Sequence, residues 1–351
     1  MQKTRESNYD LLRIISAFAI IVLHVSGTFM ESPTGVNGET ATLTCYINAL
    51  TRFAVPCFLL LSGAFLLSND KNADYNYFYK KAFKTIGIPV LIFTGIYIIP
   101  ELLAALLIAV VDKSYQRLID AVTMLITGEP AYHMWYVYML IGVYLLIPIV
   151  IKVRKEMSPK TFETISYIFF VLACISLWFS ERQIKWDIGS SFCYLSFLCV
   201  GYNIRAKTIS NKNSLKGVLF ILLGMIPLLI MGFIFDFYPA KALENIPLGN
   251  SYSILSASSG VLMFYGFSNL TIKANVSKLA SLTFTIYLVH VFVLTQLMKI
   301  LVQIPGAHND LLIPVYSIIV FIISAIIAIL YNKAQDVIEN KIKFKKIQKS
   351  A

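Results

Sequence analysis

Long apolar stretches recur along the whole chain, separated by short polar segments. Most are close to the roughly 20 residues that an α-helix needs to cross the hydrocarbon core of a bilayer. We therefore predict about ten transmembrane helices. They lie near Leu11–Met30, Cys45–Leu67, Thr85–Val111, His133–Ile151, Ile165–Ser180, Phe192–Ile204, Gly217–Asp236, Tyr252–Leu270, Leu282–Val302 and Leu312–Tyr331.

The composition is that of an integral membrane protein. Hydrophobic residues make up 57% of the 351 positions and charged residues only 14%, and the mean hydropathy is +0.71, well outside the range of soluble domains. The predicted fold is an all-α, polytopic transmembrane bundle. We assign residues 1–332 to one membrane domain. Residues 333–351 form a basic cytoplasmic tail, which we expect to be a helix lying against the inner leaflet.

Lysine and arginine are distributed unevenly among the segments that connect the predicted helices. The N-terminal segment and every second connection after it are rich in these basic residues. Together these segments hold about 22 lysines and arginines, whereas the remaining connections hold about five. Basic connections face the cytoplasm, so this asymmetry predicts that both termini are cytoplasmic. Contact with anionic lipid accounts for the net charge of +11, and we expect no nucleic-acid partner.

The first apolar stretch has features of a secretory signal, because Lys3 and Arg5 precede it. It is too long for a signal and contains Arg13 and His24, so we predict that it is retained as the first helix. The five cysteines form no C-x-x-C pair and lie in or beside the apolar stretches, which predicts neither a disulfide framework nor a metal site. They are Cys45, Cys57, Cys174, Cys193 and Cys199.

Ionisable groups at membrane depth are costly and therefore mark candidate functional sites. Arg13 and His24 are eleven residues apart, which places them on one face of the first helix, roughly 16 Å apart along its axis. Arg13 then lies near the cytoplasmic surface, where it can hold an anionic group, and His24 lies deeper, where a neutral imidazole can accept a proton. Alternatively, Arg13 only pairs with Asp10, and His24 only bonds to a neighbouring helix.

The second predicted helix carries Arg52 at about the same depth as the imidazole. Asn48 and Arg52 are at positions i and i+4 and share a face. A guanidinium here can stabilise the oxyanion of an acyl-transfer intermediate, or it can form a structural pair with Glu101 of the third helix. Pro56 and Ser62–Gly63 follow, and they allow a bend and a close approach of helices.

Two further patterns combine polar and aromatic residues. The fourth predicted helix opens with His133–Tyr136, which reads His-Met-Trp-Tyr. Thr283, Tyr287 and His290 form a polar stripe on one face of the ninth, at i, i+4 and i+7. Alone, the first pattern is typical of an aromatic belt at the membrane interface, and the second of a hydrogen bond between helices.

These elements, in this order, resemble the acyltransferase 3 family of membrane acyltransferases. The family motifs are Arg-x10-His preceded by Asp, Phe-x-x-x-Ser-Gly, His-x-Trp-Tyr opening a helix that ends in Pro, and Ser-x4-Ile-Tyr-Leu-x-His. They match, in turn, Asp10, Arg13 and His24; Phe58–Gly63; His133–Tyr136 with Pro148; and Ser281–His290. The resemblance covers essentially the whole chain.

The resemblance implies transfer of an acyl group, usually acetyl, from a cytoplasmic acyl-CoA to a hydroxyl of an envelope polysaccharide or lipid-linked sugar at the bacterial cytoplasmic membrane. Acetyl-CoA is then a donor substrate, and no cofactor or metal is bound permanently. By analogy, His24 is the base or acyl relay, and Arg13 contributes to donor binding or activity. We add Arg52 and Asp10 for donor or oxyanion binding, and Ser62, His133, Trp135, Tyr287, His290 and Glu101 as supporting or substrate-lining residues.

Two other functions stay open. A related membrane domain is joined to amino-acid racemases of vancomycin resistance and is thought to serve serine supply, which suggests uptake of a small molecule. Some relatives are proposed to export a polysaccharide unit. The intact pair of Arg13 and His24 favours catalysis, because abstraction of a proton needs this pair, whereas passive passage of a substrate through the protein does not. The sequence shows no esterase-like domain of the kind found in larger relatives, so we expect the acyl group to pass directly to its acceptor or to a separate partner protein.

Overall fold

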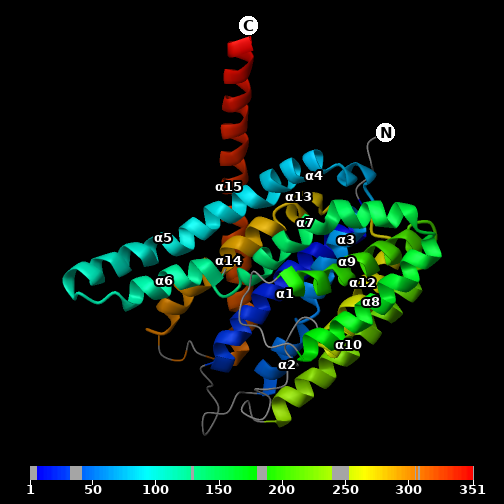
Figure 1. Cartoon of the computed structure of the whole chain (residues 1–351). Helices are drawn as coiled ribbons and strands as arrows, with labels where there is room; N and C mark the ends of the chain where they lie inside the picture. The colour runs from blue at the N-terminus through cyan, green and yellow to red at the C-terminus, as the bar shows by residue number, and fades with distance from the viewer. Residues whose placement is uncertain are drawn as a thin grey trace.

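The computed structural model describes residues 6–31, 42–127, 130–179, 188–238, 253–304, 306 and 309–350. Every regular element in these ranges is helical, as the apolar stretches predict. A π-helical segment, Phe83–Gly87, joins α4 to α5, and 3₁₀ turns occupy Asp70–Ala73 and Asp310–Leu312. The α-helices are α1 (Ser7–Glu31), α2 (Thr42–Leu50), α3 (Ala54–Leu66), α4 (Tyr75–Ala82), α5 (Ile88–Val111), α6 (Gln116–Thr127), α7 (Trp135–Glu156), α8 (Pro159–Phe179), α9 (Ile188–Thr208), α10 (Ser214–Phe237), α12 (Ile254–Asn269), α13 (Ser277–Ala280), α14 (Thr283–Leu301) and α15 (Ile313–Ser350) (Figure 1).

Seven helical segments in the described ranges are long and apolar enough to cross a membrane. Each corresponds to one of the ten predicted spans. The other three predictions fall on α8, α9 and α12, and residues 180–187, between α8 and α9, lie outside the described part. α12 has 16 residues, fewer than the roughly 20 that a full crossing needs. The all-helical fold is therefore confirmed with seven candidate spans, whereas the count of about ten and the cytoplasmic termini stay predictions.

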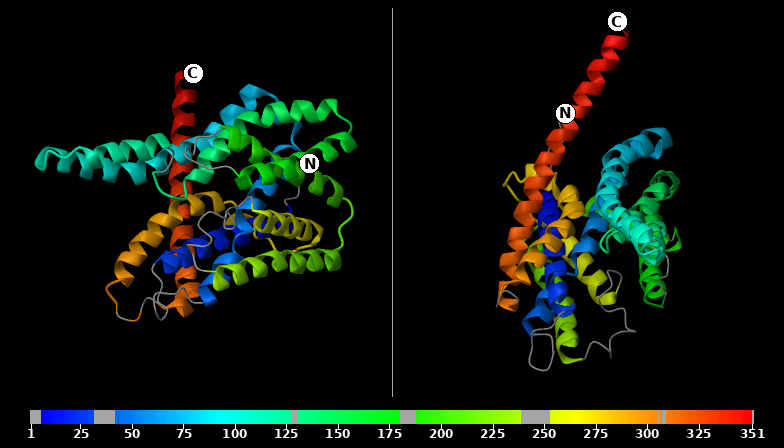
Figure 2. Two further views of the ribbon diagram at one scale, coloured as in Figure 1. Left: turned by 60° about the horizontal axis from the view of Figure 1, so that its bottom comes forward. Right: turned by 90° about the vertical axis from the view of Figure 1, so that its left-hand side faces the viewer.

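α1 lies at the centre of the bundle (Figure 2), where it packs against α2, α3, α12, α13, α14 and α15. Its side chains Tyr9, Leu12 and Val25 are fully buried. α1 also begins at the end of the bundle from which α15 projects (Figure 1). The helix that carries Arg13 and His24 is therefore surrounded mainly by protein rather than by lipid.

The second predicted span is broken into two helices. α2 ends at Leu50, residues 51–53 form a turn, and α3 begins at Ala54. The backbone in the break is still hydrogen-bonded, since Arg52 N donates to Ala49 O at 3.1 Å and Ala54 N donates to Thr51 O at 3.2 Å. Irregular backbone at membrane depth requires such partners. Arg52 is thus presented from a helix break, not from one face of a continuous helix.

α3 and α9 cross very closely because each presents a glycine to the backbone of the other. A Cβ atom on Gly63 would lie 1.9 Å from the carbonyl oxygen of Leu198, and one on Gly201 would lie 2.0 Å from that of Leu60. Small residues at such contacts let helix backbones approach in a membrane, where packing rather than water drives association. The close approach predicted at Ser62–Gly63 is confirmed.

α4, the π-helical segment and α5 form one continuous rod, Tyr75–Val111. The rod is curved in the right-hand view of Figure 2, and a π-helical turn is a recognised cause of a bend. α6 folds back along α5, and the pair projects from the bundle (Figure 1). The helix begins at Tyr75, ahead of the predicted span near Thr85–Val111, because the polar α4 continues into it without a break.

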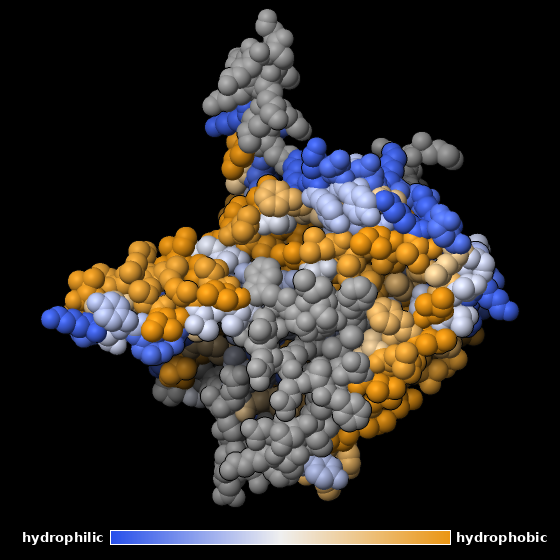
Figure 3. Space-filling model, in the orientation of Figure 1, coloured by the Kyte–Doolittle hydropathy of each residue, from blue (hydrophilic) through white to orange (hydrophobic). Residues whose placement is uncertain are grey.

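Aliphatic side chains cover much of the outside of the bundle (Figure 3). On α10, Leu215, Leu222 and Ile226 are 82%, 61% and 50% exposed. A contiguous apolar surface of this extent is stable against lipid hydrocarbon rather than water.

α15 runs without a break to Ser350, past its candidate span Asp310–Ile338. Its final turns project straight from the bundle (Figures 1 and 2). The tail is helical, as predicted, and no bend separates it from the candidate span. Its course along the inner leaflet stays a prediction.

Candidate active site

Three histidines from distant parts of the sequence meet inside the bundle. His24 lies on α1, His133 lies just before α7, and His290 lies on α14. The ring centroids of His24 and His290 are 5.2 Å apart, with planes inclined by 29°, and those of His133 and His290 are 5.1 Å apart. The sequence presents these residues as three separate patterns. The structure brings them together in one histidine cluster (His24, His133 and His290).

The central ring of the cluster, that of His290, has a defined hydrogen-bonding pattern. Its Nδ1 lies 2.6 Å from the carbonyl oxygen of Tyr287, and because a carbonyl oxygen only accepts, we assign the proton of this bond to Nδ1. Nε2 then carries the lone pair. It is buried and finds no hydrogen-bond partner among the described residues. A buried acceptor without a partner is costly, and it suits a site that receives a donor group from a substrate.

The members of the cluster differ in access. His290 and His133 are 0% and 1% exposed, whereas His24 is only partly buried. The exposed Tyr132 stands edge-on to His24, with ring centroids 5.0 Å apart. His24 is therefore the most accessible member of the cluster.

Two tyrosines tie together the helices that carry the cluster. The hydroxyl of Tyr287 donates to the backbone carbonyl of His133. The hydroxyl of Tyr97, on α5, donates to the carbonyl of Leu288 at 2.9 Å and accepts from Phe292 N at 3.1 Å. Tyr97 and Tyr132 were missed by the sequence analysis. A tyrosine in an apolar stretch has no local signal that distinguishes it from a packing residue.

Arg52 is held beside α1 by Asn48, as the i, i+4 spacing predicts. Its Nε and Nη2 donate to Asn48 Oδ1 at 3.0 and 2.7 Å. The amide nitrogen of Asn48 in turn donates to Leu23 O at 3.2 Å and to Ser26 Oγ at 3.0 Å. These two acceptors flank His24 in α1. One asparagine therefore links the helix break to the stretch of α1 that carries His24.

Replacing Asn48 with alanine should destabilise the protein by about 1–3 kcal/mol, because it removes the acceptor of a partly buried guanidinium. Activity should fall as well, since Arg52 loses its position. Thermal unfolding in detergent measures the first effect. Asn203→Ala is the matched control, because Asn203 is also buried but its amide nitrogen has no hydrogen-bond partner in the described part. Equal unfolding temperatures for the two variants would contradict this role of Asn48.

Arg13 and Asp10 form an ion pair at 2.8 Å, with the two side chains 26% and 2% exposed. The Arg13 guanidinium also stands 4.8 Å from the ring centroid of Phe65, and that of Arg205 stands 4.9 Å from the same centroid. Arg205 is in turn paired with Glu6. The predicted pairing of Arg13 with Asp10 is thus present. The Arg13 guanidinium stays partly exposed within this pair. It could therefore also bind an anion, eleven residues before His24 on α1.

The remaining candidates take other partners. Ser62 Oγ donates to Phe58 O at 2.8 Å within α3, and the Trp135 ring lies against those of Tyr136 and Tyr194. Glu101 binds Arg117 of α6 through both carboxylate oxygens, at 2.7 and 3.1 Å. The predicted alternative of a Glu101–Arg52 pair is therefore wrong, because residue spacing sets depth but not the direction in which a side chain leaves its helix. Roles for these residues at the site stay predictions.

A metal centre finds no support in the described residues. His, Cys, Asp and Glu form no group of three there that could hold an ion. The cluster and the adjacent Arg52 offer imidazoles and a guanidinium, which suit proton transfer and stabilisation of an oxyanion.

Comparison with known families adds to what these residues indicate. The sequence model of a family described as an acyltransferase domain matches residues 6–333. The chain belongs to the acyltransferase 3 family. Membership covers nearly the whole described bundle, including all three members of the histidine cluster, and it supports a membrane acyltransferase.

One curated relative of this acyltransferase 3 protein is an amino-acid racemase from Enterococcus faecalis. The two are 26% identical over 368 aligned positions, which cover 99% of the chain and 49% of the racemase. The chain thus spans about half the length of this relative. No solved structure matches the chain.

Proposed function

We propose that this protein transfers an acyl group, usually acetyl, from cytoplasmic acyl-CoA to a hydroxyl of an envelope polysaccharide or lipid-linked sugar. The observation that carries the proposal is the partly exposed His24, stacked on the buried His290 at the centre of the bundle. We further propose that the bundle lies in the cytoplasmic membrane of a bacterium, with both termini in the cytoplasm.

His24 acts as the general base in this reaction. It takes the proton of the acceptor hydroxyl while the oxygen attacks the thioester carbonyl. The C–O bond forms, the C–S bond breaks, and the CoA thiolate takes up the proton from the imidazolium. Arg52, held by Asn48, stabilises the oxyanion between these steps. In the alternative order, His24 attacks the thioester, the C–S bond breaks, and the CoA thiolate leaves an acyl-imidazolium. The hydroxyl oxygen then takes the acyl group from His24, and its proton passes to the thiolate.

Arg13 binds the donor in this proposal. Arg13→Ala should raise the KM for acyl-CoA roughly 10- to 100-fold, the usual effect of losing a charged hydrogen bond, and should change kcat less. Steady-state kinetics on purified protein measure both constants. Arg117→Ala is the control, since this arginine is also paired with a carboxylate but lies on the projecting α6. An unchanged KM in Arg13→Ala would exclude donor binding by this residue.

The test of the function is incorporation of radiolabelled acetyl from acetyl-CoA into envelope glycans of cells that carry the natural acceptor. We expect labelling above the empty vector with the native chain. Labelling equal to the empty vector, with the protein present in the membrane, would overturn the acetyltransferase proposal.

A second candidate, uptake of a small molecule, is favoured by the match to an amino-acid racemase. Uptake of labelled serine into cells or proteoliposomes separates the two functions. Serine uptake that depends on the chain, without acetyl incorporation, would replace acyl transfer as the function. Acetyl incorporation without serine uptake would exclude it.

A further inference from the structure

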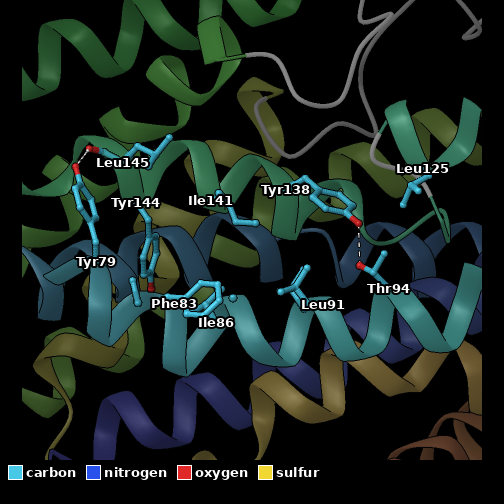
Figure 4. A pocket seen from close by; sticks show the side chains of 13 residues that line it. Tyr79, Phe83, Ile86, Leu91, Thr94, Leu125, Tyr138, Ile141, Tyr144 and Leu145 are labelled. Carbon is cyan, nitrogen blue, oxygen red and sulfur yellow. Dashed lines mark hydrogen bonds between the residues drawn. The ribbon is translucent and has the colours of Figure 1, made fainter. Parts of the chain in front are cut away.

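An apolar cavity of about 430 Å³ lies between the curved rod of α4 and α5 and the first half of α7 (Figure 4). A tyrosine hydrogen bond joins its two walls at each end. The Tyr79 hydroxyl donates to Leu145 O at 2.8 Å, and the hydroxyls of Tyr138 and Thr94 lie 2.8 Å apart. Between these bonds the walls are aliphatic and aromatic, with Ile141 near the middle of α7's contribution. The cavity is therefore a slot with two fixed ends.

Tyr79 and Thr94 bracket the slot on the rod, and Tyr138 and Leu145 bracket it on α7. Fifteen residues separate Tyr79 from Thr94 along the rod, a rise of about 22 Å, whereas only seven separate Tyr138 from Leu145 on α7, a rise of about 10 Å. The π-helical segment lies inside this longer stretch, and its residues Phe83, Ile86 and Gly87 line the slot. A bend at a π-helical turn is a structural feature of the rod, so the slot belongs to the fold itself.

The slot faces the lipid side of the bundle. Phe83, Leu91 and Leu145 line it and are 58%, 62% and 50% exposed. Water has too few polar partners in such a space to occupy it stably, and an empty slot would forfeit the dispersion contacts of its walls. In a bilayer, a hydrocarbon chain can occupy the slot, because it needs no polar partners and restores the dispersion contacts of the walls.

One edge of the slot is cationic. Lys80, Lys81 and Lys84 are exposed, and they alternate along the rod with the lining residues Tyr79, Ala82 and Phe83. Figure 3 shows hydrophilic side chains gathered over α4, beside the hydrophobic surface. Lysines next to a membrane surface attract the phosphates of anionic lipids. An acyl chain and a phosphate separated by a short glycerol linker match a slot with a basic edge.

We propose that this slot is a binding site for one anionic phospholipid, with an acyl chain between α5 and α7 and the phosphate at Lys80, Lys81 and Lys84. The bound chain supports α5 against α7. Tyr97 lies one turn beyond Thr94 and touches His133 at 5.4 Å between ring centroids, so the lipid supports a wall of the histidine cluster. The site is independent of which acyl acceptor the protein uses.

Native mass spectrometry of the full chain, titrated with phosphatidylglycerol or phosphatidylcholine of identical acyl chains, tests this proposal. We expect one phosphatidylglycerol to be retained about tenfold more than phosphatidylcholine. Ile141→Trp fills the slot and should reduce that retention about tenfold. Ile149→Trp should leave it unchanged, because Ile149 lies on the same helix, is 46% exposed and does not line the slot. Equal retention in native and Ile141→Trp protein would overturn the proposal.

The headgroup is tested separately. Lys80→Gln, Lys81→Gln and Lys84→Gln together should abolish the preference for phosphatidylglycerol, whereas the same change at the exposed Lys160, Lys273 and Lys278 should not. Equal retention of phosphatidylglycerol and phosphatidylcholine by the native chain would overturn the proposal that the bound phospholipid is anionic. Retention of a polyprenyl phosphate instead would overturn the choice of a phospholipid.

Photocrosslinking of the native chain tests the site without any substitution, so misfolding of a variant cannot affect the result. Phosphatidylglycerol with a photoactivatable group on one acyl chain should crosslink to peptides that contain residues 79–94 or 138–145. Adducts spread evenly over the exposed surface of α10 would show only general contact with lipid and would overturn the site.

Discussion

Replacing His24 with alanine should lower acyl transfer by about 10²–10⁴-fold, the usual contribution of a positioned general base. The imidazole is partly exposed and stacks on His290 without filling a closed core position. Membrane levels and the unfolding temperature should therefore stay close to native. His24→Asn should behave in the same way, because an amide retains much of the size and polarity but cannot act as a base at neutral pH.

Labelled acetyl transfer at saturating acyl-CoA measures this effect. Ile15→Ala is the matched control, because Ile15 is also partly buried on α1 and packs against the core without contacting the histidine cluster. It should keep activity within about threefold. Transfer by His24→Ala above a third of the native rate would remove His24 from the chemistry, and the buried Nε2 of His290 would become the next candidate base.

Replacing Gly63 with alanine should destabilise the bundle by about 3 kcal/mol or more, a large effect for one methyl group. The added Cβ would lie 1.9 Å from Leu198 O and 2.3 Å from Leu198 Cα. Both atoms belong to the backbone of α9, so no side-chain rotation relieves the clash and the two helices must separate. We expect a strong loss of folded protein in the membrane.

Heating detergent-solubilised protein and measuring the fraction that stays monodisperse tests this expectation. Gly95→Ala is the control, since its Cβ would meet only the Ile99 side chain, at an ordinary 3.5 Å. That variant should match or slightly exceed native stability, because alanine favours a helix by up to about 1 kcal/mol over glycine. Unfolding temperatures for Gly63→Ala and Gly95→Ala within 2 °C of each other, which is about 1.5 kcal/mol for a chain of this length, would contradict the close contact between α3 and α9.

The sequence predicted well those features that lie on a single helix. Apolar length alone located the seven candidate spans, and residue spacing alone placed Arg13 with His24 on α1 and Asn48 beside Arg52. In each case the relation spans eleven residues or fewer along the chain. Helical geometry converts such a separation directly into a direction and a distance.

Relations between helices could not be predicted in the same way. His133 alone suggested a membrane-interface belt and His290 a simple interhelical hydrogen bond, because a pattern within one helix does not identify its neighbours. For the same reason the predicted pair of Glu101 and Arg52 was wrong, because the sequence does not show that Glu101 faces Arg117 of α6. The π-helical segment has no marker in Phe83–Gly87 that distinguishes it from an ordinary helix, and the slot beside it was therefore invisible in the sequence.

The straight end of α15 has a practical value for imaging the protein. From residue 339 to Ser350 the helix extends past its candidate span by about 18 Å. A helical partner fused in register after Ser350 would continue the same rod and share its orientation. Single-particle electron microscopy would gain from it a rigid fiducial marker for aligning a bundle whose own surface lies within the detergent or lipid belt.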